Sequence, residues 1–339
     1  METTPNAMES AHCLIATLAS PPGDEEGGAT IERETGDEHE VSPILISRTS
    51  RLIDLTAIIV PFLVFIAAVI AMWGRGFGWA ELWIMTGMYL ITGLGVTVGF
   101  HRLFAHKAFE TRRLARIVIA VLGSMSVQGP LMWWVALHRK HHHHSDEEGD
   151  PHSPHTHGSS VRGLVAGAWH AHVGWLFKTD GPGLARYVPD LMKDRALRLI
   201  SDLYPLWAAM GLILPAVAGG LLMKSWIGVL SGFVWGGLVR VFLVHHVTWS
   251  VNSVCHIWGS RPYASHDHSR NNFIVGLLAL GEGWHNNHHA FPTSARHGLH
   301  WWQFDITWCV IRVMKWLGLA SAVRVPATHV LQAKRTSAA

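Results

Sequence analysis

The chain has 339 residues, of which 49% are hydrophobic and 15% charged, and its formal net charge is +3. An average soluble domain carries about 25% charged residues, so this composition predicts a membrane protein rather than a soluble one. The small net charge argues against a nucleic-acid partner, and three cysteines without C-x-x-C spacing indicate neither a disulfide framework nor a thiolate zinc site.

Both ends of the chain are predicted to be disordered tails. Residues 1–50 are polar and acidic and lack a basic start followed by an apolar core, so they do not read as a signal peptide. Residues 325–339 are interpreted in the same way. The part between them, residues 51–324, is expected to form one folded domain.

The apolar stretches predict an all-α membrane protein with four transmembrane helices. A spanning helix needs about 20 mostly apolar residues. Four stretches meet that requirement: residues 52–73, 78–100, 203–223 and 226–247. The 17 tryptophans agree with this interpretation, because tryptophan favours the membrane–water interface.

The distribution of basic residues predicts the topology. Residues 101–202 carry thirteen Lys and Arg, whereas the connections inside the two helix pairs are short. The positive-inside rule therefore places both termini in the cytoplasm, together with a helical cap made of residues 101–202 and 248–324. Residues 117–137 and 304–320 are apolar but interrupted or charged, so they are expected to lie in the interface rather than cross the bilayer.

The last predicted span should continue beyond the membrane. No helix breaker follows it until Gly259, so the helix would project into the cytoplasm and carry Asn252 and His256 four residues apart on one face. The earlier span ending near residue 100 would deliver His101 in the same way.

Three histidine clusters lie on this cytoplasmic side: HRLFAH at 101–106, HRKHH at 138–142 and HNNHH at 285–289. Imidazole is a good ligand for iron, copper, zinc and nickel. Adjacent histidines diverge, so each HH pair can serve two neighbouring metals, and His101 and His106, about 140° apart on a helix, also suit two metals better than one. Nine candidates are enough for two metals: His101, His106, His138, His141, His142, His256, His285, His288 and His289.

A metal-sequestering tract, an affinity tag or a metal transporter could also be rich in histidine. The stretch 138–157 contains eight histidines and could be a metal-sequestering tract or resemble an affinity tag. Its internal position and the two matching clusters argue against both. A histidine-rich metal transporter would need ligating residues inside the spans. Such residues are scarce there, because Arg240 lies near an inner edge and Asp54 and Glu81 lie only at span ends.

The clusters resemble those of the membrane-bound fatty acid desaturases, in particular the stearoyl-CoA desaturase-like group and its bacterial and cyanobacterial members. The resemblance covers about residues 50–320 and is carried by GFHRLFAHKAFE, HRKHHHHSDEEGDPHSPH, HAHVGWLF, TWSVNSVCHIWG and GEGWHNNHHAFPTSARHG. It implies two iron ions in the cytoplasmic cap, bound by the nine histidines, with Asn252 reaching one iron through water. The implied activity is an O2-dependent desaturation that introduces a first cis double bond, at the ninth carbon, into an acyl chain.

The resemblance also implies a bent tunnel for the acyl chain, lined by Gln128, Trp134, Thr248 and Trp249. Metal-binding histidines often donate their second N–H to a carboxylate. Asp150 and Glu282 lie close to the clusters in sequence and are candidates for that role. The roles of His170 and His172 stay open, as does a related hydroxylase activity on the same scaffold.

The carrier and the electron source are left as alternatives. Only Lys178 offers a basic group near the position where acyl-CoA enzymes contact the nucleotide, so CoA, lipid and acyl-carrier-protein substrates all remain. The sequence contains no HPGG haem motif, so it does not indicate a fused cytochrome b5 domain. Electrons are therefore expected from a separate ferredoxin, rubredoxin, cytochrome b5 or flavin reductase that uses NAD(P)H. The predicted location is a membrane, most simply the bacterial inner membrane.

Overall fold

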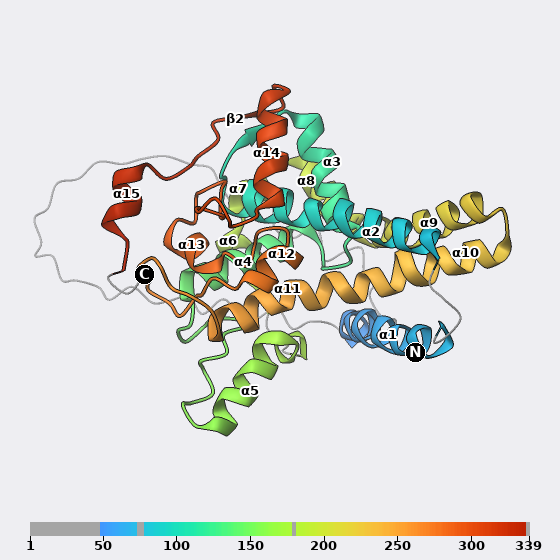
Figure 1. Cartoon of the computed structure of the whole chain (residues 1–339), viewed down its shortest axis with the longest axis horizontal. Helices are drawn as coiled ribbons and strands as arrows, with labels where there is room; N and C mark the ends of the chain where they lie inside the picture. Colours follow the sequence, from blue (N-terminus) through green and yellow to red (C-terminus); the bar gives the residue numbers. More distant parts are fainter. Residues whose placement is uncertain (1–47, 73–77, 178–180, 337–339) are drawn as a thin grey trace, which may run out of the picture. The chain divides into compact units, whose positions relative to one another are not determined.

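A computed structural model describes residues 48–72, 78–177 and 181–336. The disordered tail predicted for residues 1–50 falls outside this description up to residue 47. The first helix, α1, runs from Arg48 to Met72 and contains Pro61. The chain is mainly helical, as its composition predicts (Figure 1).

Three helical stretches among the described residues are long and apolar enough to cross a membrane, and they are Trp79–Ala105, Tyr204–Met223 and Trp226–Ile257. In α1 the apolar stretch found is the shorter Ile58–Ala68. Three of the four predicted spans are therefore borne out by length and composition, and the span at 52–73 stays a prediction.

Two of these stretches extend beyond their predicted ends, and each contains a π-helical segment. The first consists of α2 (Trp79–Leu94) followed by the π-helix η2 (Gly95–Ala105). The third consists of α10 (Trp226–Gly232), the π-helix η4 (Phe233–Val239) and α11 (Arg240–Ile257). The predicted continuation of the last span is confirmed, since α11 carries both Asn252 and His256.

The second stretch is α9 (Tyr204–Met223), which packs against α10 in a tight hairpin. Lys224 turns the chain in the left-handed conformation with φ of 49°, and the Ser225 side chain then accepts a hydrogen bond from the amide of Gly228. A Cβ on Gly219 would lie 2.1 Å from the carbonyl oxygen of Gly228, so the two backbones can approach this closely only with glycine.

Between and after these stretches lie short helices that form the rest of the fold. Their bounds are α3 Arg113–Ser124, α4 Leu131–His144, α5 Val161–His172, η3 Gly174–Phe177, α6 Leu184–Tyr187, α7 Pro189–Met192, α8 Arg195–Asp202, α12 Phe273–Leu278, α13 His285–Ala290 and α14 Ile306–Trp316. Strands β1 (Glu110–Thr111) and β2 (Ala320–Ser321) pair antiparallel, with Glu110 opposite Ser321.

The two apolar segments that the sequence excluded as spans are short helices in the structure. Residues 117–137 divide between α3 and α4, with a break at residues 125–130. Residues 304–320 contain α14, which is only 11 residues long. Neither is long enough to cross a bilayer, because spanning takes about 20 residues.

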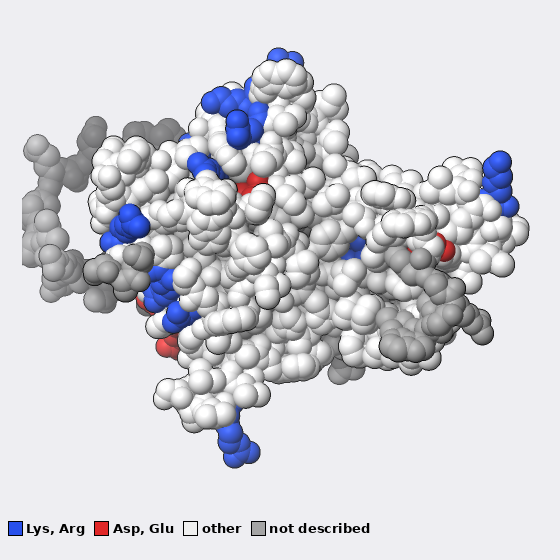
Figure 2. Space-filling view, in the orientation of Figure 1, with Lys and Arg blue, Asp and Glu red and all other residues white. Residues whose placement is uncertain are grey.

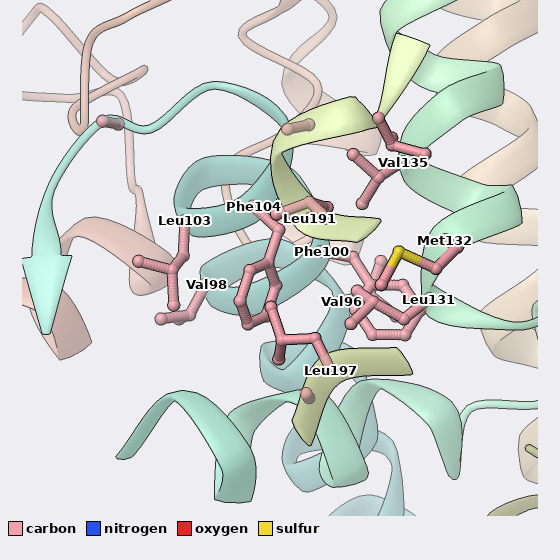
Figure 3. Close-up of a cluster of buried hydrophobic side chains, with 14 of the residues drawn as sticks. Val96, Val98, Phe100, Leu103, Phe104, Leu131, Met132, Val135, Leu191 and Leu197 are labelled. Carbon is pink, nitrogen blue, oxygen red and sulfur yellow. The ribbon is translucent and has the colours of Figure 1, made fainter. Parts of the chain in front are cut away.

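The largest apolar core joins η2 to the helices around it. Phe100 and Phe104 on η2 are almost fully buried against Leu131 and Val135 on α4 and Leu197 on α8 (Figure 3). This core fixes the orientation of η2, and the histidines at the end of that helix are positioned with it.

The surface over the spanning helices is apolar. Figure 2 shows few charged side chains on the near face of α2, α9, α10 and α11, whereas Lys and Arg gather elsewhere. Along α9, Ile213, Val217 and Leu221 are 56%, 49% and 73% exposed. Exposed aliphatic side chains in such a row suit contact with lipid rather than water.

The end of the chain corrects one prediction. Residues 325–339 were expected to be disordered, but α15 forms at Thr328–Ala333. The chain after it is tied down by backbone hydrogen bonds from Ala264 to Lys334, 2.7 Å, and from Thr336 to Pro262, 2.9 Å. Tertiary contacts thus order a segment whose composition alone is that of a tail.

Candidate metal centre

The nine predicted histidines converge and divide into two groups. Within each group the ring nitrogens that face one another lie within 4.8 Å. The five-histidine group consists of His101, His106, His138, His142 and His288. The four-histidine group consists of His141, His256, His285 and His289. The side chains come from η2, α4, α11 and α13, which are far apart in sequence, so tertiary folding builds both groups.

The adjacent histidines diverge as the sequence suggested. His141 belongs to the four-histidine group and His142 to the five-histidine group. The same division separates His289 from His288. Each HH pair on α4 and α13 therefore contributes one ring to each group, which keeps the two groups side by side.

The expectation for His101 and His106 was wrong. An α-helix would turn them about 140° apart, yet both rings belong to the five-histidine group. The cause is η2, which places residues five apart one hydrogen-bonded turn from each other. The His106 amide accordingly donates to the His101 carbonyl at 3.1 Å.

The Nε2 atoms of these rings crowd together inside the two groups. The Nε2 atoms of His101 and His288 are 3.1 Å apart, and that of His288 is also 2.9 Å from Nε2 of His142. In the other group, Nε2 of His285 and of His256 are 3.1 Å apart. Nε2 of His141 and Nε2 of His289 are buried and have no hydrogen-bond partner among the residues that the structure describes. Buried, unpartnered nitrogens are costly unless something binds them.

Carboxylates occupy the opposite side of four of the rings. Glu282 lies 2.6 Å from Nδ1 of His101, Asp150 lies 3.0 Å from Nδ1 of His141, and Asp146 lies 2.8 Å from Nδ1 of His256. Asp267 contacts Nδ1 of His289. A ring that donates from Nδ1 to a carboxylate keeps its Nε2 lone pair free, which is the arrangement found behind metal-bound histidines. The donor set and the unpartnered nitrogens therefore fit metal ions.

Two of these four carboxylates were foreseen and two were missed. Asp150 and Glu282 are next to the clusters in sequence, which is why proximity suggested them. Asp146 lies in the same acidic run as Asp150, but its partner His256 is 110 residues away. Asp267 belongs to the segment between α11 and α12, and no spacing links it to His289.

The directions in which the pKa values of the following residues are shifted agree with metal binding. Burial, with the neighbouring histidines, lowers the pKa of His138, His142 and His288 well below the usual value. Burial alone would raise the pKa of Asp146 and Asp150, but their contacts with His256 and His141 outweigh it and lower both. Neutral imidazoles backed by ionised carboxylates are the forms that bind cations.

A buried ion network behind His101 also escaped the sequence analysis. The Arg102 guanidinium is fully buried and donates to Glu282 at 2.9 Å and to Asp305 at 3.0 Å. Nδ1 of His297 lies 3.0 Å from Glu282, which also contacts His101. Arg102 and Asp305 thus fix the carboxylate that supports a histidine of the five-histidine group. Arg102 follows His101 directly in the sequence, but nothing in the sequence indicates that it holds Glu282.

A cavity opens onto both groups. Its lining includes His101 and His138 from the five-histidine group, His141 and His285 from the four-histidine group, and Asn252. The remaining walls are mostly apolar: Tyr89, Gly93, Val96, Thr97, Val244, Val247, Val251, Leu278, Ala279 and Leu280. The cavity is therefore mostly apolar and ends at the histidines of the two groups.

Three of the four predicted tunnel residues line this cavity, and hydrogen bonds connect their side chains. Gln128 donates to the Thr248 hydroxyl at 2.8 Å and accepts from the Trp134 indole at 3.2 Å. Trp249 is buried but is not among the lining residues, and its ring lies 5.0 Å from those of His245 and His246.

Histidines outside the two groups have varied surroundings. His152 is buried with its ring 4.4 Å from that of His141, whereas His143 is exposed. Nε2 of His172 is 3.0 Å from Nδ1 of His246, and its Nδ1 is 3.0 Å from the Ser253 hydroxyl. His170 is buried on α5, its ring 5.0 Å from that of His157.

Comparison with known sequences identifies the family that this site represents. The family model for fatty acid desaturases matches residues 77–314, a range that contains both histidine groups and the cavity. The chain belongs to the fatty acid desaturase family. It is therefore an oxidoreductase that acts on acyl chains, and the predicted resemblance is confirmed.

This desaturase has characterised relatives across most of its length. It is 41% identical over 279 residues to a hex-5-enoyl-[acyl-carrier protein] acetylenase from Moorena producens, covering 82% of this chain and 87% of the relative. It is 38% identical over 255 residues to an acyl-CoA C20 Δ5-desaturase from Anemone leveillei, covering 74% and 76%. It is 37% identical over 268 residues to an sn-1 stearoyl-lipid 9-desaturase from Synechocystis sp., covering 77% of each.

Proposed function

We propose that this desaturase introduces a first cis double bond, at the ninth carbon, into a saturated acyl chain carried on CoA or on a lipid. The observation that carries the proposal is the mostly apolar cavity whose walls include histidines of both groups. An alkyl chain inside it would meet the centre directly. The mostly apolar lining suits a saturated chain, because burying alkyl surface against apolar side chains is favourable.

The chemistry requires a redox metal. A methylene C–H bond has no acidic proton, so acid–base catalysis by side chains cannot begin the reaction. Zinc lacks redox chemistry, which leaves iron as the better assignment for the imidazole ligands. We assign two iron ions, one to each histidine group, with Asn252 near the four-histidine group through water. When bound, the iron pair supplies the oxidation that removes hydrogen from the acyl chain.

The overall reaction balances with dioxygen as oxidant. The –CH2–CH2– unit, one O2, two electrons and two protons give –CH=CH– and two water molecules. The chain's own residues do three things in this scheme. The histidines hold the irons, while Asp146, Asp150, Asp267 and Glu282 orient the rings and keep their lone pairs directed inward.

The third task is substrate positioning, which we assign to Gln128, Trp134, Thr248 and Trp249. Gln128, Trp134 and Thr248 form a hydrogen-bonded set on the cavity wall. Because these hydrogen bonds join their polar groups, the three side chains present a shaped surface to the acyl chain. A shaped wall next to the histidines would select which methylene pair reaches the metals.

For the membrane arrangement we propose four spans, namely α1 and the three stretches that are long and apolar enough to cross a bilayer. Both termini and the cap then lie in the cytoplasm, so all the histidines share one face. The exposed aliphatic row on α9 and the scarcity of charge over the spans support a multi-pass protein. The bacterial inner membrane is the location that we propose.

The relatives leave several carriers and positions as candidates. The three named above act on an acyl-carrier-protein substrate, a CoA substrate and a lipid substrate respectively, and one is a 9-desaturase by name. Electrons would come from a separate ferredoxin, rubredoxin, cytochrome b5 or flavin reductase that draws on NAD(P)H.

The proposal is tested by producing the protein with a reductase in a host that makes only saturated chains. Fatty acids are then analysed by mass spectrometry, with double-bond positions assigned after derivatisation. The expected product is a cis Δ9 monoene, formed only when O2 is present. Hydroxy acids without monoenes would establish the related hydroxylase instead, and metal uptake without either product would establish a transporter.

A further inference from the structure

The loop between α3 and α4, residues 125–130, brings Gln128 to the cavity wall and contains a strained residue beside it. Val127 has φ of 66°, a left-handed conformation that is unfavourable for a β-branched residue. The next residue is Gln128, which reaches the Trp134 indole and the Thr248 hydroxyl. Strain of this kind persists only where surrounding contacts hold the backbone in place.

Two side chains of the last spanning stretch provide those contacts. Nε2 of His245 donates to the Val127 carbonyl at 2.9 Å. Arg240 is fully buried and donates from Nη1 to the Met125 carbonyl at 3.2 Å. His245 and Thr248 are three residues apart on α11, so they are neighbours on its surface and hold two consecutive residues of the loop.

Arg240 ties the loop to two further segments. Its Nη2 donates to the Gly211 carbonyl on α9 at 2.6 Å, and its Nε donates to the Gly236 carbonyl within η4 at 3.2 Å. A Cβ on Gly211 would lie 2.3 Å from the Met125 carbonyl oxygen, so the loop packs directly against the α9 backbone. A buried arginine whose fork is used on backbone carbonyls holds these three segments in one fixed arrangement.

Neither side chain belongs to the cavity wall itself. The lining from α11 consists of Val244, Val247, Thr248, Val251 and Asn252. His245 and Arg240 therefore do not touch an acyl chain in the cavity. They act on it through Gln128, whose position depends on the backbone that they hold.

We propose that His245 and Arg240 are positioning residues that determine where along the acyl chain the double bond is placed. The inference rests on the proposed desaturase function and goes beyond it, because it assigns the selection of the site to residues outside the cavity. Loosening the loop lets Gln128 move along the wall, so neighbouring methylene pairs can reach the histidine groups.

The test measures the position of the double bond rather than the rate. Full-length protein in membranes of the host described above is compared with His245→Leu, which lacks the donor, and with His245→Gln, whose side-chain amide can again donate. His246→Leu is the matched control, because His246 lies next to His245 but bonds to His172 rather than to the loop. Monoene isomers from palmitic and stearic chains are quantified for each variant.

Wild type and His246→Leu are expected to form one isomer almost exclusively. In His245→Leu the ratio of that isomer to its neighbours should fall by about tenfold, as expected for one lost buried hydrogen bond, and His245→Gln should restore most of it. An unchanged ratio in His245→Leu, or an equal fall in His246→Leu, would overturn the inference. Where His245→Leu fails to accumulate, Arg240→Lys decides, because lysine cannot hold the Met125 and Gly211 carbonyls together.

The inference and the proposed function fail in different ways. If wild type forms no monoene at all, the desaturase proposal fails and takes this one with it. If wild type forms a single monoene and the variants of His245 and Arg240 form the same one, only the role of these two residues is rejected.

Discussion

Nδ1 of His141 lies 3.0 Å from both carboxylate oxygens of Asp150, while Nε2 of the same ring is buried and has no hydrogen-bond partner in the described part of the chain. One side of the imidazole is thus fixed by a buried carboxylate, and the other faces the four-histidine group. The contact determines both the orientation and the tautomer of a candidate ligand.

Replacing that carboxylate should weaken metal binding without removing a ligand. Asp150→Asn is expected to lower iron affinity by about 10- to 100-fold, because an amide no longer accepts the Nδ1 hydrogen as an anion. Iron per protein, measured by elemental analysis after dialysis against a chelator, checks this. Glu148→Gln, two residues earlier and exposed, is the control and should retain its iron.

The histidine run on α4 offers a second matched comparison. His138→Ala should abolish monoene formation, since His138 belongs to the five-histidine group and lines the cavity. His143→Ala changes an exposed ring of the same run and should leave product yield near the wild-type level. Product analysis by gas chromatography distinguishes them. Desaturation that survives in His138→Ala would remove this run from the active site.

The buried ion network should be important for stability. Asp305 accepts hydrogen bonds from Arg102 and from the amides of His297, Gly298 and Trp308. Asp305→Ala would leave the Arg102 charge partly uncompensated in a buried site, which typically costs about 3–5 kcal/mol. A large fall in the melting temperature of the detergent-solubilised protein is expected, whereas the exposed Asp202→Asn should melt like wild type. Equal melting temperatures would contradict the assigned role.

Acid should destabilise the iron-free protein. The pKa values of His138, His142, His285 and His288 are lowered by burial and by neighbouring histidines. The unfolded chain therefore binds more protons than the folded one below the ordinary histidine pKa of about 6.5, and stability falls as the pH falls below it.

Thermal unfolding of the apoprotein between pH 7.5 and 5.5 measures this effect. Each histidine that stays neutral in the fold contributes a slope of at most about 1.4 kcal/mol per pH unit. Asp146 and Asp267, whose pKa values are lowered, add a loss only below the ordinary aspartate pKa of about 4. A melting temperature that is constant or rises towards pH 5.5 would contradict the neutral state of the histidines.

Much of the site could be predicted because histidine clusters are local sequence features. Six of the nine histidines were found from H-x-x-HH spacing and two from the H-x4-H spacing of residues 101–106, and the divergence of each HH pair followed from the geometry of one backbone. Asn252 and His256 followed from the absence of a breaker before Gly259. These inferences need only a few neighbouring residues, so a sequence suffices for them.

What escaped prediction depends on tertiary contacts or on unusual backbone. Asp146, Asp267 and Asp305 have partners that are distant in sequence, so no spacing identifies them. The π-helix η2 changed the outcome for His101 and His106, because periodicity arguments assume α-helical turns. The ordering of residues 328–336 depends on pairing with residues 262–264, which composition cannot reveal.

The way the five-histidine group is assembled constrains how the protein is made. Its first member is His101 and its last is His288, so the group cannot close until the ribosome has passed residue 288 and α9 to α11 have been made. Loading with metal is therefore a late step in biogenesis. A chain truncated before α13 would carry four of these five histidines and only two of the other four, open to any metal ion that binds imidazole.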